Sequence, residues 1–453
     1  MRPRRLSDVA RAVGGTLLGD DVVVSSVEID SRRVGPGALF VALRGTRADG
    51  ASFVPDAYAR GAAAVLVPEA VRPDGPAVAV ASTNEALLAL AADERDRLDA
   101  TVVAVTGANG KTTTKDMAAA VAATRFRTHA SPASFNNEIG APVTLLGAPP
   151  GTEVLVAELG ARHLGDVAYL CSIVRPHVAV VTNVGVAHME VFGSWEKIVE
   201  AAAEPVEALD ADGVAILNAD DPVVAGYAAR TRARVVRFGR AADADVRAID
   251  VALDDGGVAS WTLVLGDERV PIRLGVPGEH IVSDALAAAA VGGVLGVDPP
   301  RVADALGDAA LSPWRMETFT TRSGVRVVND AYNANPESTA AALRTARWIA
   351  RDGRLIAVLG EMAELGPISE AAHDRIGELA ARIGVDRLVA VGEAARPIAL
   401  AAEREGIEPG HVAWYAGADD ALDDVRAHAR GGDVVLCKAS RVVGLERVAE
   451  GLG

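Results

Sequence analysis

The 453-residue sequence contains few aromatic residues, only two cysteines and fewer basic than acidic side chains. Aromatic residues make up 4% of the chain while hydrophobic residues make up 50%, so Ala, Val and Leu must fill most of the cores. Cys171 and Cys437 both lie in apolar runs, which predicts buried free thiols instead of a disulfide or a metal site. The formal charge of −16 argues against a nucleic-acid partner.

The sequence also has no long hydrophobic run. The basic residues at its start are not followed by the apolar segment of a signal peptide, and we expect an amphipathic first helix there. The longest apolar stretch, residues 285–297, is too short to cross a bilayer and contains Gly292 and Gly293, so it predicts a buried helix. We therefore expect a cytoplasmic protein without a membrane span, and a monomer as the default state.

The length predicts about three domains, with ~150 residues per domain as a guide. Strand-like and helix-like segments alternate along the chain, which is typical of α/β folds. Residues 244–274 instead alternate in hydrophobicity between Gly-containing turns and predict an antiparallel meander. We place the domains at residues 1–97, 98–313 and 314–453.

The clearest motif is TVVAVTGANGKTTTKD at residues 101–116. It predicts a buried parallel strand, a glycine-rich turn, and a helix that runs from Lys111 to about Ala123. The amides of such a turn can surround a phosphate, Lys111 can reach terminal phosphates, and the Thr112 hydroxyl suits Mg²⁺. The turn is short, because its first glycine stands three residues before Gly110. The predicted nucleotide site consists of Gly107, Ala108, Asn109, Gly110, Lys111, Thr112 and Thr113.

Polar residues follow several strand-like runs of the second predicted domain. Glu158 closes the apolar run VLVAE, and His188 follows the run that ends at Asn183. Ligands of open α/β sheets collect beyond the carboxyl ends of the strands, so we expect these side chains to share one edge. Taken alone, each could equally be a hydrogen-bonded surface or core group. Together with Thr112, Glu158 and His188 predict a Mg²⁺ site, although His is a less usual ligand than oxygen for this ion.

A series of motifs carries a family resemblance. In order, the chain contains SSVEIDSR, GANGKTT, FNNEIG, ELGARHLGD, TNVGVAHMEVFGS, LNADDP, PGEH, NDAYNANPES, LGEMAELG and KASR. This series resembles the Mur ligases of peptidoglycan synthesis over almost the whole chain. The resemblance implies a small α/β UDP-binding domain, a central P-loop-like ATPase domain with a mostly parallel sheet, and a C-terminal Rossmann-like domain.

Within the family, NDAYNANPES and LGEMAELG are most similar to the member that joins D-alanyl-D-alanine to UDP-N-acetylmuramoyl-tripeptide. The resemblance implies that ATP phosphorylates the tripeptide carboxylate, with Mg²⁺ as cofactor, and that the dipeptide amine attacks the acyl phosphate. It implies catalytic roles for Lys111, Glu158, His188 and Asn137. It adds Asn218, Arg315, Asp330 and Tyr332 to the ATP site, and it places Asp30, Ser31, Arg32, Asn136, Asn333 and Asn335 at the substrates.

The sequence departs from the family pattern at the position of a lysine that is usually carbamylated to bind magnesium. Alignment through FGS puts Ala202 at that position. Our hypothesis is that Glu200 or Glu204 partly replaces the missing charge, or that the second Mg²⁺ binds weakly. Ile281 and Asp284 stand where the family tends to have Asn, and Ala439 stands where it has Gly.

Four other functions stay open at this point. The UDP-type first domain argues against folylpolyglutamate synthase, which shares the short nucleotide loop, and NDAYNANPES argues against the diamino-acid-adding sibling. A guanine-reading Asn-Lys-x-Asp motif would indicate a nucleotide-operated switch, and the sequence lacks this motif. A degenerate ligase with weakened catalysis is the fourth. The sequence leaves open whether the tripeptide carries meso-diaminopimelate or lysine.

Overall fold

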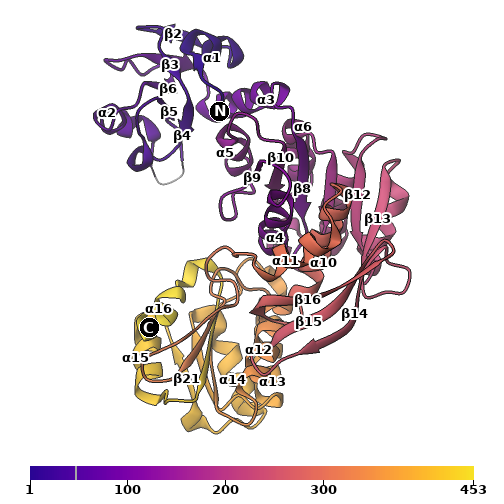
Figure 1. Cartoon of the computed structure of the whole chain (residues 1–453). Helices are drawn as coiled ribbons and strands as arrows, with labels where there is room; N and C mark the ends of the chain where they lie inside the picture. Colours follow the sequence, from indigo (N-terminus) through magenta and orange to yellow (C-terminus); the bar gives the residue numbers. More distant parts are fainter. Residues whose placement is uncertain (46–47) are drawn as a thin grey trace.

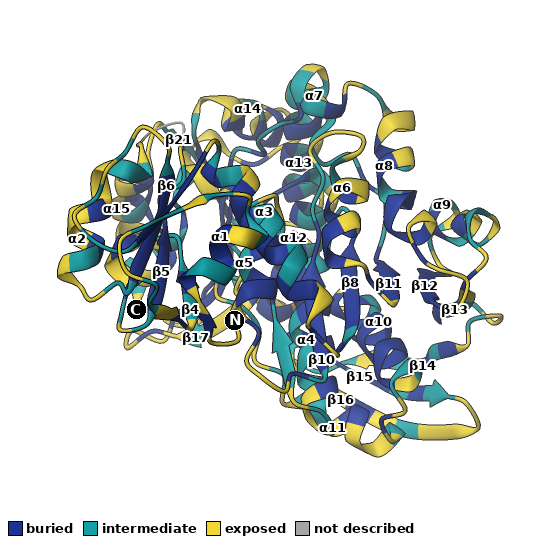
Figure 2. Cartoon of the chain, turned by 90° about the horizontal axis from the view of Figure 1, so that it is seen from above, coloured by how far each residue is buried: buried dark blue, intermediate teal, exposed yellow. Residues whose placement is uncertain are grey.

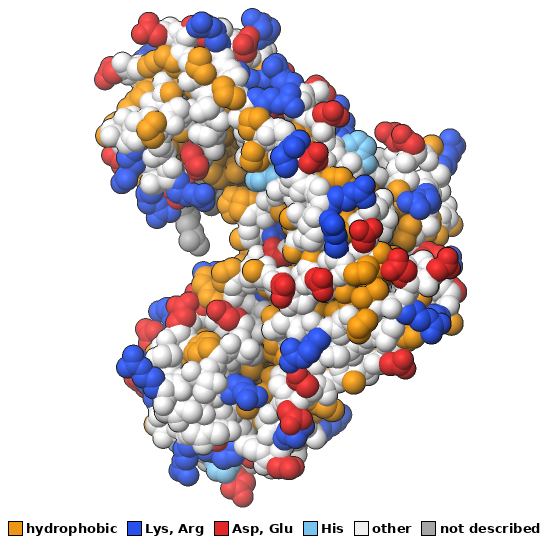
Figure 3. Space-filling model, viewed as in Figure 1, with side chains coloured by type: hydrophobic (Ala, Val, Ile, Leu, Met, Phe, Trp, Pro, Cys, Tyr) orange, Lys and Arg blue, Asp and Glu red, His pale blue; other side chains and the backbone are white. Residues whose placement is uncertain are grey.

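The computed structural model describes residues 1–45 and 48–453. It contains a five-stranded, a nine-stranded and a six-stranded sheet, besides one two-stranded pair. The five-stranded sheet defines an N-terminal domain, the nine-stranded sheet a central domain and the six-stranded sheet a C-terminal domain (Figure 1). A deep notch separates the N-terminal from the C-terminal domain in the space-filling view, and the central domain closes it on one side (Figure 3). Among the described residues, no helix is long and apolar enough to cross a membrane.

The N-terminal domain is a small α/β unit. Its sheet has the order β2-β7-β6-β5-β4, in which β2 is antiparallel to β7 and the other pairs are parallel. A short β1–β3 pair, three α-helices and two short 3-10 helices, labelled η, complete it. The bounds are β1 Arg4–Arg5, α1 Leu6–Ala12, β2 Thr16–Leu18, β3 Val23–Val24, β4 Ser26–Glu28, η1 Ser31–Arg33, β5 Ala38–Val41, η2 Gly50–Phe53, α2 Val54–Ala59, β6 Ala64–Pro68, β7 Ala77–Val80 and α3 Thr83–Asp96.

The central sheet has the order β16-β15-β14-β13-β12-β11-β8-β10-β9. Pairing is parallel from β9 to β14 and antiparallel from β14 to β16, which confirms both the parallel sheet and the meander. Its strands are β8 Thr101–Thr106, β9 Thr128–Ala130, β10 Val154–Glu158, β11 Val178–Val181, β12 Val214–Asn218, β13 Arg234–Gly239, β14 Val246–Leu253, β15 Val258–Leu265 and β16 Glu268–Pro277. Its helices are α4 Lys111–Ala123, α5 Gly140–Gly147, α6 Asp166–Val174, α7 Met189–Phe192, α8 Trp195–Glu207, α9 Pro222–Gly226, η3 Tyr227–Arg230, α10 Ile281–Val294 and α11 Pro299–Gly307.

The C-terminal sheet has the order β17-β18-β22-β19-β20-β21 and is parallel except for the edge strand β17. Parallel strands joined through helices confirm the doubly wound arrangement. Its strands are β17 Glu317–Thr320, β18 Arg326–Asn329, β19 Leu355–Gly360, β20 Arg387–Val391, β21 Val412–Tyr415 and β22 Val434–Lys438. Its helices are α12 Pro336–Ala350, η4 Gly366–Ile368, α13 Ser369–Arg382, η5 Glu393–Ala395, α14 Arg396–Arg404, η6 Pro409–His411, α15 Ala418–His428, η7 Arg441–Val443 and α16 Glu446–Leu452.

Small aliphatic side chains build the central core, as the composition predicts. Strands β8, β11 and β12 are buried almost throughout (Figure 2). Helices α4 and α10 pack together, and a Cβ on Gly292 of α10 would lie 2.7 Å from a methyl of Val121. The apolar stretch therefore forms the predicted helix as far as Val294, buried up to Gly292, and Cys171 and Cys437 are buried free thiols.

The central and C-terminal domains also touch far from the nucleotide loop. The Trp348 indole N–H, near the end of α12, donates a hydrogen bond to the Asp254 carbonyl at 2.9 Å. Arg351 pairs with Asp255 beside it. Both acceptors lie in the turn between β14 and β15, so the meander supports the C-terminal domain.

Candidate active site

The glycine-rich turn leads from buried strand β8 into α4, as predicted, and its geometry demands glycine at two positions. Gly107 has φ +136°, and a Cβ there would lie 2.1 Å from the Thr182 hydroxyl. Gly110 has φ +78°, and its Cβ would lie 1.9 Å from an Asp284 carboxylate oxygen. Any larger residue would strain the backbone and push the loop out of place.

The end of β11 fixes the turn from the other side. The Thr182 hydroxyl donates to the Asn109 carbonyl at 2.6 Å. The Asn183 side chain accepts the Asn109 N–H at 2.8 Å, and its amide donates to the Asn109 carbonyl at 3.0 Å. Lys111 Nζ lies over the turn and donates to the Gly107 carbonyl at 2.7 Å. The loop is thus held in shape before any phosphate is bound, and burial lowers the pKa of Lys111.

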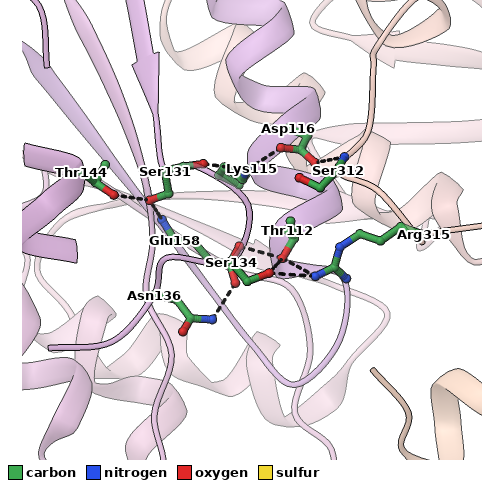
Figure 4. Close-up of polar contacts among 10 residues, drawn as sticks. All are labelled: Thr112, Lys115, Asp116, Ser131, Ser134, Asn136, Thr144, Glu158, Ser312 and Arg315. Carbon is green, nitrogen blue, oxygen red and sulfur yellow. Dashed lines mark hydrogen bonds and ion pairs between the residues drawn. The ribbon is translucent and has the colours of Figure 1, made fainter. Parts of the chain in front are cut away.

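Polar side chains from three segments meet at the start of α4 (Figure 4). The Thr112 hydroxyl donates to the Glu158 carboxylate at 2.7 Å and contacts the Ser134 hydroxyl at 2.9 Å. The Asn136 amide donates to the other Glu158 oxygen at 2.7 Å. Arg315 donates to the Thr112 and Ser134 hydroxyls at 2.7 and 3.0 Å. The structure therefore brings together the predicted residues Thr112, Glu158, Asn136 and Arg315.

Thr112 and Glu158 suit a magnesium ion. Their oxygens are 2.7 Å apart, close to the ~3 Å edge of an octahedron with metal–oxygen distances of ~2.1 Å. Mg²⁺ commonly takes one or two protein oxygens and completes its shell with water and substrate phosphates. Within residues 1–45 and 48–453, no group of three or more His, Cys, Asp or Glu side chains is arranged to hold a metal.

His188 does not join this cluster in the structure. Its ring Nδ1 contacts the carboxylate of Glu364, which also receives the Arg162 guanidinium. Burial lowers the pKa of His188, and the bond to Glu364 only partly opposes this shift. The expected ligand is therefore engaged by the C-terminal domain.

The hypothesis that Glu204 partly replaces the charge of the missing lysine is wrong in this structure, and for Glu200 it stays a prediction. Both Glu204 oxygens accept backbone N–H groups at the start of α6, from Gly165 at 2.6 Å and Ala168 at 2.7 Å. Glu200 pairs with Arg230 at 2.5 Å on the protein surface. Both Glu204 oxygens are thus engaged at the start of α6, and Glu200 is held at the surface by Arg230.

The C-terminal domain supplies further predicted residues. The Tyr332 ring lies 4.3 Å from the Arg315 guanidinium carbon and supports it by a cation–π contact. The Asn335 amide donates to the Asn109 side-chain oxygen at 2.7 Å. Asp330 accepts the Met316 N–H at 3.2 Å and pairs with buried Lys438, which also donates to the Asn333 carbonyl at 2.9 Å.

Other predicted residues have local structural partners. The Asn137 side chain accepts the Gly140 N–H at 2.9 Å at the start of α5, and buried Asn218 donates to the Thr182 carbonyl at 2.8 Å. Thr113 is buried in α4, and the Ala108 N–H donates to the Asn183 carbonyl at 2.9 Å.

The predicted Asp30-Ser31-Arg32 set lies in the N-terminal domain, outside the cluster around Thr112. Arg32 donates to Asp30 at 2.9 and 2.7 Å, and its hydrogen bonds lower the pKa of Asp30 to about 2. Arg32 is exposed and Asp30 is half-buried, while Ser31 between them is buried.

The sequence reasoning missed several residues that shape the site. Thr182 and Glu364 lie in the motifs TNVGVAHMEVFGS and LGEMAELG, but nothing in those motifs assigned them a role, and Ser134 lies outside every motif named above. Asp284 had a signal, because it was singled out as a departure from the family. In the structure it is buried against Gly110, and burial raises the pKa of Asp284 to about 8 while nearby Arg315 opposes the shift.

Comparison with known proteins agrees with this architecture. The Mur ligase middle domain matches residues 105–292, the Mur ligase glutamate ligase domain matches residues 314–441, and the Mur ligase family catalytic domain matches residues 23–95. The UDP-N-acetylmuramoyl-tripeptide–D-alanyl-D-alanine ligase of Mycobacterium tuberculosis strain H37Rv is 43% identical, over 95% of this chain and 92% of that protein. The chain belongs to the Mur ligase family.

Solved structures resemble this Mur ligase over nearly its full length. MurF from Acinetobacter baumannii superposes with a TM-score of 0.88 at 29% identity, covering 99% of this chain and 98% of that one. MurF ligase from Thermotoga maritima, in complex with ADP, gives a TM-score of 0.79 at 29% identity, covering 94% and 96% of the two chains. The three-domain α/β fold predicted from the sequence is thereby confirmed.

Proposed function

We propose that this Mur ligase uses ATP to join D-alanyl-D-alanine to UDP-N-acetylmuramoyl-tripeptide. One observation carries the proposal: Arg315 and Asn335, from beyond the central domain, contact Thr112 and Asn109 of the nucleotide loop. Two domains therefore contribute to one phosphate site, as a ligase requires when it must hold both a nucleotide and two substrates. The curated relative and the MurF structures favour this pair of substrates over those of other Mur ligases.

The residues suit phosphoryl transfer followed by amide formation. The loop amides and Lys111 hold the ATP phosphates, and Arg315 faces the charge that develops on the transferred group. Mg²⁺ held by Thr112 and Glu158 would neutralise phosphate charge. The tripeptide carboxylate attacks the γ-phosphorus, ADP leaves, and the acyl phosphate forms. The neutral dipeptide amine then attacks the acyl carbon, phosphate leaves, and the nitrogen loses a proton.

The other predicted roles belong to the same proposal. Asp30, Ser31 and Arg32 hold the UDP portion in the N-terminal domain, and Asn218, Asp330 and Tyr332 border the nucleotide. Asn136, Asn137, Asn333 and Asn335 line the cleft between the domains. His188 would be free to hold a second Mg²⁺ if its contact with Glu364 opened. We also propose residues 1–97, 98–313 and 314–453 as the domain limits, and action in the cytoplasm as a monomer.

Phosphate release tests this function. The purified protein is incubated with ATP and Mg²⁺, with and without D-alanyl-D-alanine and the UDP-linked tripeptide carrying either meso-diaminopimelate or lysine. We expect release only when both substrates are present, together with a new UDP-linked pentapeptide by mass spectrometry. Release without the dipeptide, or activity with a free diamino acid and a UDP-linked dipeptide, would contradict the proposal and indicate a hydrolase or the diamino-acid-adding sibling.

A further inference from the structure

A buried ion pair lies one turn beyond the nucleotide loop, and no role in the proposed reaction accounts for it. Lys115 is 2% exposed, and its ammonium pairs with the neighbouring Asp116 carboxylate, which is 12% exposed. A lysine that deep in a core is costly unless its charge is neutralised and its protons are bonded. Lys115 also donates to the Ser131 carbonyl at 2.9 Å, so the pair is built into the domain.

The second oxygen of Asp116 reaches the segment that connects the two domains. It accepts the backbone N–H of Ser312 at 2.7 Å (Figure 4). Ser312 lies three residues before Arg315, which donates to the Thr112 hydroxyl at 2.7 Å. Thr112 and Asp116 are four residues apart and share one face of α4. The segment from Ser312 to Arg315 is therefore tied to the same helix at two points, one turn apart.

The backbone around Arg315 explains why such an anchor is needed. Trp314 and Met316, on either side of it, have φ +61° and +50°, a left-handed conformation that non-glycine residues avoid. Strained positions persist only where the surroundings hold them. Trp314 is held by an indole hydrogen bond to Glu450 at 3.1 Å and by Arg441, whose guanidinium carbon lies 4.3 Å from its ring.

The pair also connects to the strand end that carries Glu158. The Ser131 hydroxyl accepts the Glu158 N–H at 3.1 Å, and the Thr144 hydroxyl donates to it at 3.1 Å. Lys115 binds the carbonyl of that same Ser131. One chain of contacts thus runs from the strand end of Glu158 through Lys115 and Asp116 to the linker (Figure 4).

We propose that Asp116, held in place by Lys115, is a positioning residue that anchors the linker at Ser312 and so directs Arg315 onto the Thr112 hydroxyl and the transferred phosphate. The inference rests on the proposed function, because Arg315 matters only if phosphate is transferred there. Asp116 itself touches neither the nucleotide loop nor the substrates. Its effect on turnover must therefore pass through Arg315.

A double-mutant cycle measures this dependence through phosphate release. We expect Asp116→Ala to lower kcat about tenfold, since a charge-assisted hydrogen bond is lost, and to change the KM for ATP less than about twofold. Arg315→Ala should lower kcat by roughly 10² or more. In the Arg315→Ala background, Asp116→Ala should lower kcat by less than a further factor of about two, because the Arg315 side chain through which Asp116 acts is already absent. Independent, multiplying effects would overturn the proposal.

Two further variants separate positioning from folding. Lys115→Met/Asp116→Asn keeps an oxygen for the Ser312 N–H and leaves no buried charge unpaired, so kcat should recover to within about threefold of the parent. Ser312→Pro removes the N–H donor, although it also fixes φ at residue 312, and should be as slow as Asp116→Ala, even if the latter folds poorly. Both variants must unfold near the parent temperature for the test to count. The proposal is then wrong if Lys115→Met/Asp116→Asn stays slow, or if Ser312→Pro keeps the parent kcat.

Asp245→Ala is the matched control, because Asp245 accepts the Arg237 N–H at 2.8 Å in a part of the central domain remote from the cluster around Thr112. Its kcat should equal that of the parent. If Arg315→Ala itself retained the parent kcat, the proposed function would fail. If Arg315→Ala were slow while Asp116→Ala were normal, only the positioning role would fail.

Discussion

Glu364 of the C-terminal domain pairs with His188 of the central domain. The same carboxylate receives Arg162, and its backbone carbonyl accepts the Glu190 N–H at 3.0 Å. Burial alone would raise the pKa of Glu364, but His188 and Arg162 lower it, so the carboxylate is charged. Three contacts through Glu364, two residues before η4, thus join the C-terminal domain to the start of α7 and to the loop between β10 and α6.

The first prediction concerns this contact. Glu364→Ala should shift the protein towards a more open arrangement of domains, because its partly exposed ion pair with Arg162 and its hydrogen bond with His188 are together worth about 1 kcal/mol. Small-angle scattering without nucleotide should then give a larger radius of gyration. Glu403→Ala, an exposed carboxylate on α14, is the control. An unchanged scattering curve for Glu364→Ala would show that the contact does not hold the domains together.

The second prediction concerns Lys111. Lys111→Met should lower kcat by roughly 10²–10³, because one preorganised cation is removed from the transferring phosphate. The fold should survive, since Lys111 contacts only loop carbonyls. Phosphate release and thermal unfolding are the measurements, with Lys197→Met on the exposed face of α8 as the control. Turnover at the parental rate would remove Lys111 from the mechanism.

The third prediction follows from the environment of Glu204 and Glu200. Glu204→Ala should destabilise the protein by about 0.5–2 kcal/mol, since the start of α6 loses the carboxylate that accepts the N–H groups of Gly165 and Ala168. Glu200→Ala should cost little, because its pair with Arg230 is exposed. Urea unfolding measures both costs. The Mg²⁺ concentration for half-maximal activity should stay the same in both variants, and an increase in either would revive the replacement hypothesis.

The fourth prediction concerns pH and Asp284. Because burial raises the pKa of Asp284 to about 8, the folded state holds a proton that the unfolded state releases near pH 4. The free energy of unfolding should therefore fall as pH rises from about 4 to 8. Asp284→Asn removes this dependence and should stabilise the protein at pH 8 relative to the parent by up to a few kcal/mol, while the two proteins differ less at pH 5. The measurement is the urea midpoint of unfolding of both proteins at pH 5 and pH 8. An equal change of the midpoint with pH in the parent and in Asp284→Asn would contradict the prediction.

The sequence predicted those strands and helices whose own residues form an apolar run or a helical pattern. The short apolar runs that end at Glu158 and Asn218 form buried strands, and the helix that begins at Lys111 ends at Ala123 as predicted. Edge strand β17 escaped prediction because its sequence ETFT has no continuous apolar run, and β21 escaped it although VAWY is apolar, because four residues are too few to separate a strand from other apolar segments.

Contacts between domains could not be read from the sequence. His188 carries a motif, but its partner Glu364 stands 176 residues away, and only the fold brings the two together. The same holds for Asp116 and Ser312, which are 196 residues apart. Spacing along the chain reports neighbours within one helix or strand, whereas these pairs depend on how whole domains pack.

Helix α12 begins beside the nucleotide loop and ends against the meander. Asn335 at its start contacts Asn109, and Trp348 in its last turn contacts Asp254. The helix has 15 residues, so these ends lie about 20 Å apart on one rigid rod. A change in the β14–β15 turn would therefore tilt α12 and move the Asn335 amide that contacts the nucleotide loop. A surface substitution far from the phosphates can thus alter the affinity of the site for them.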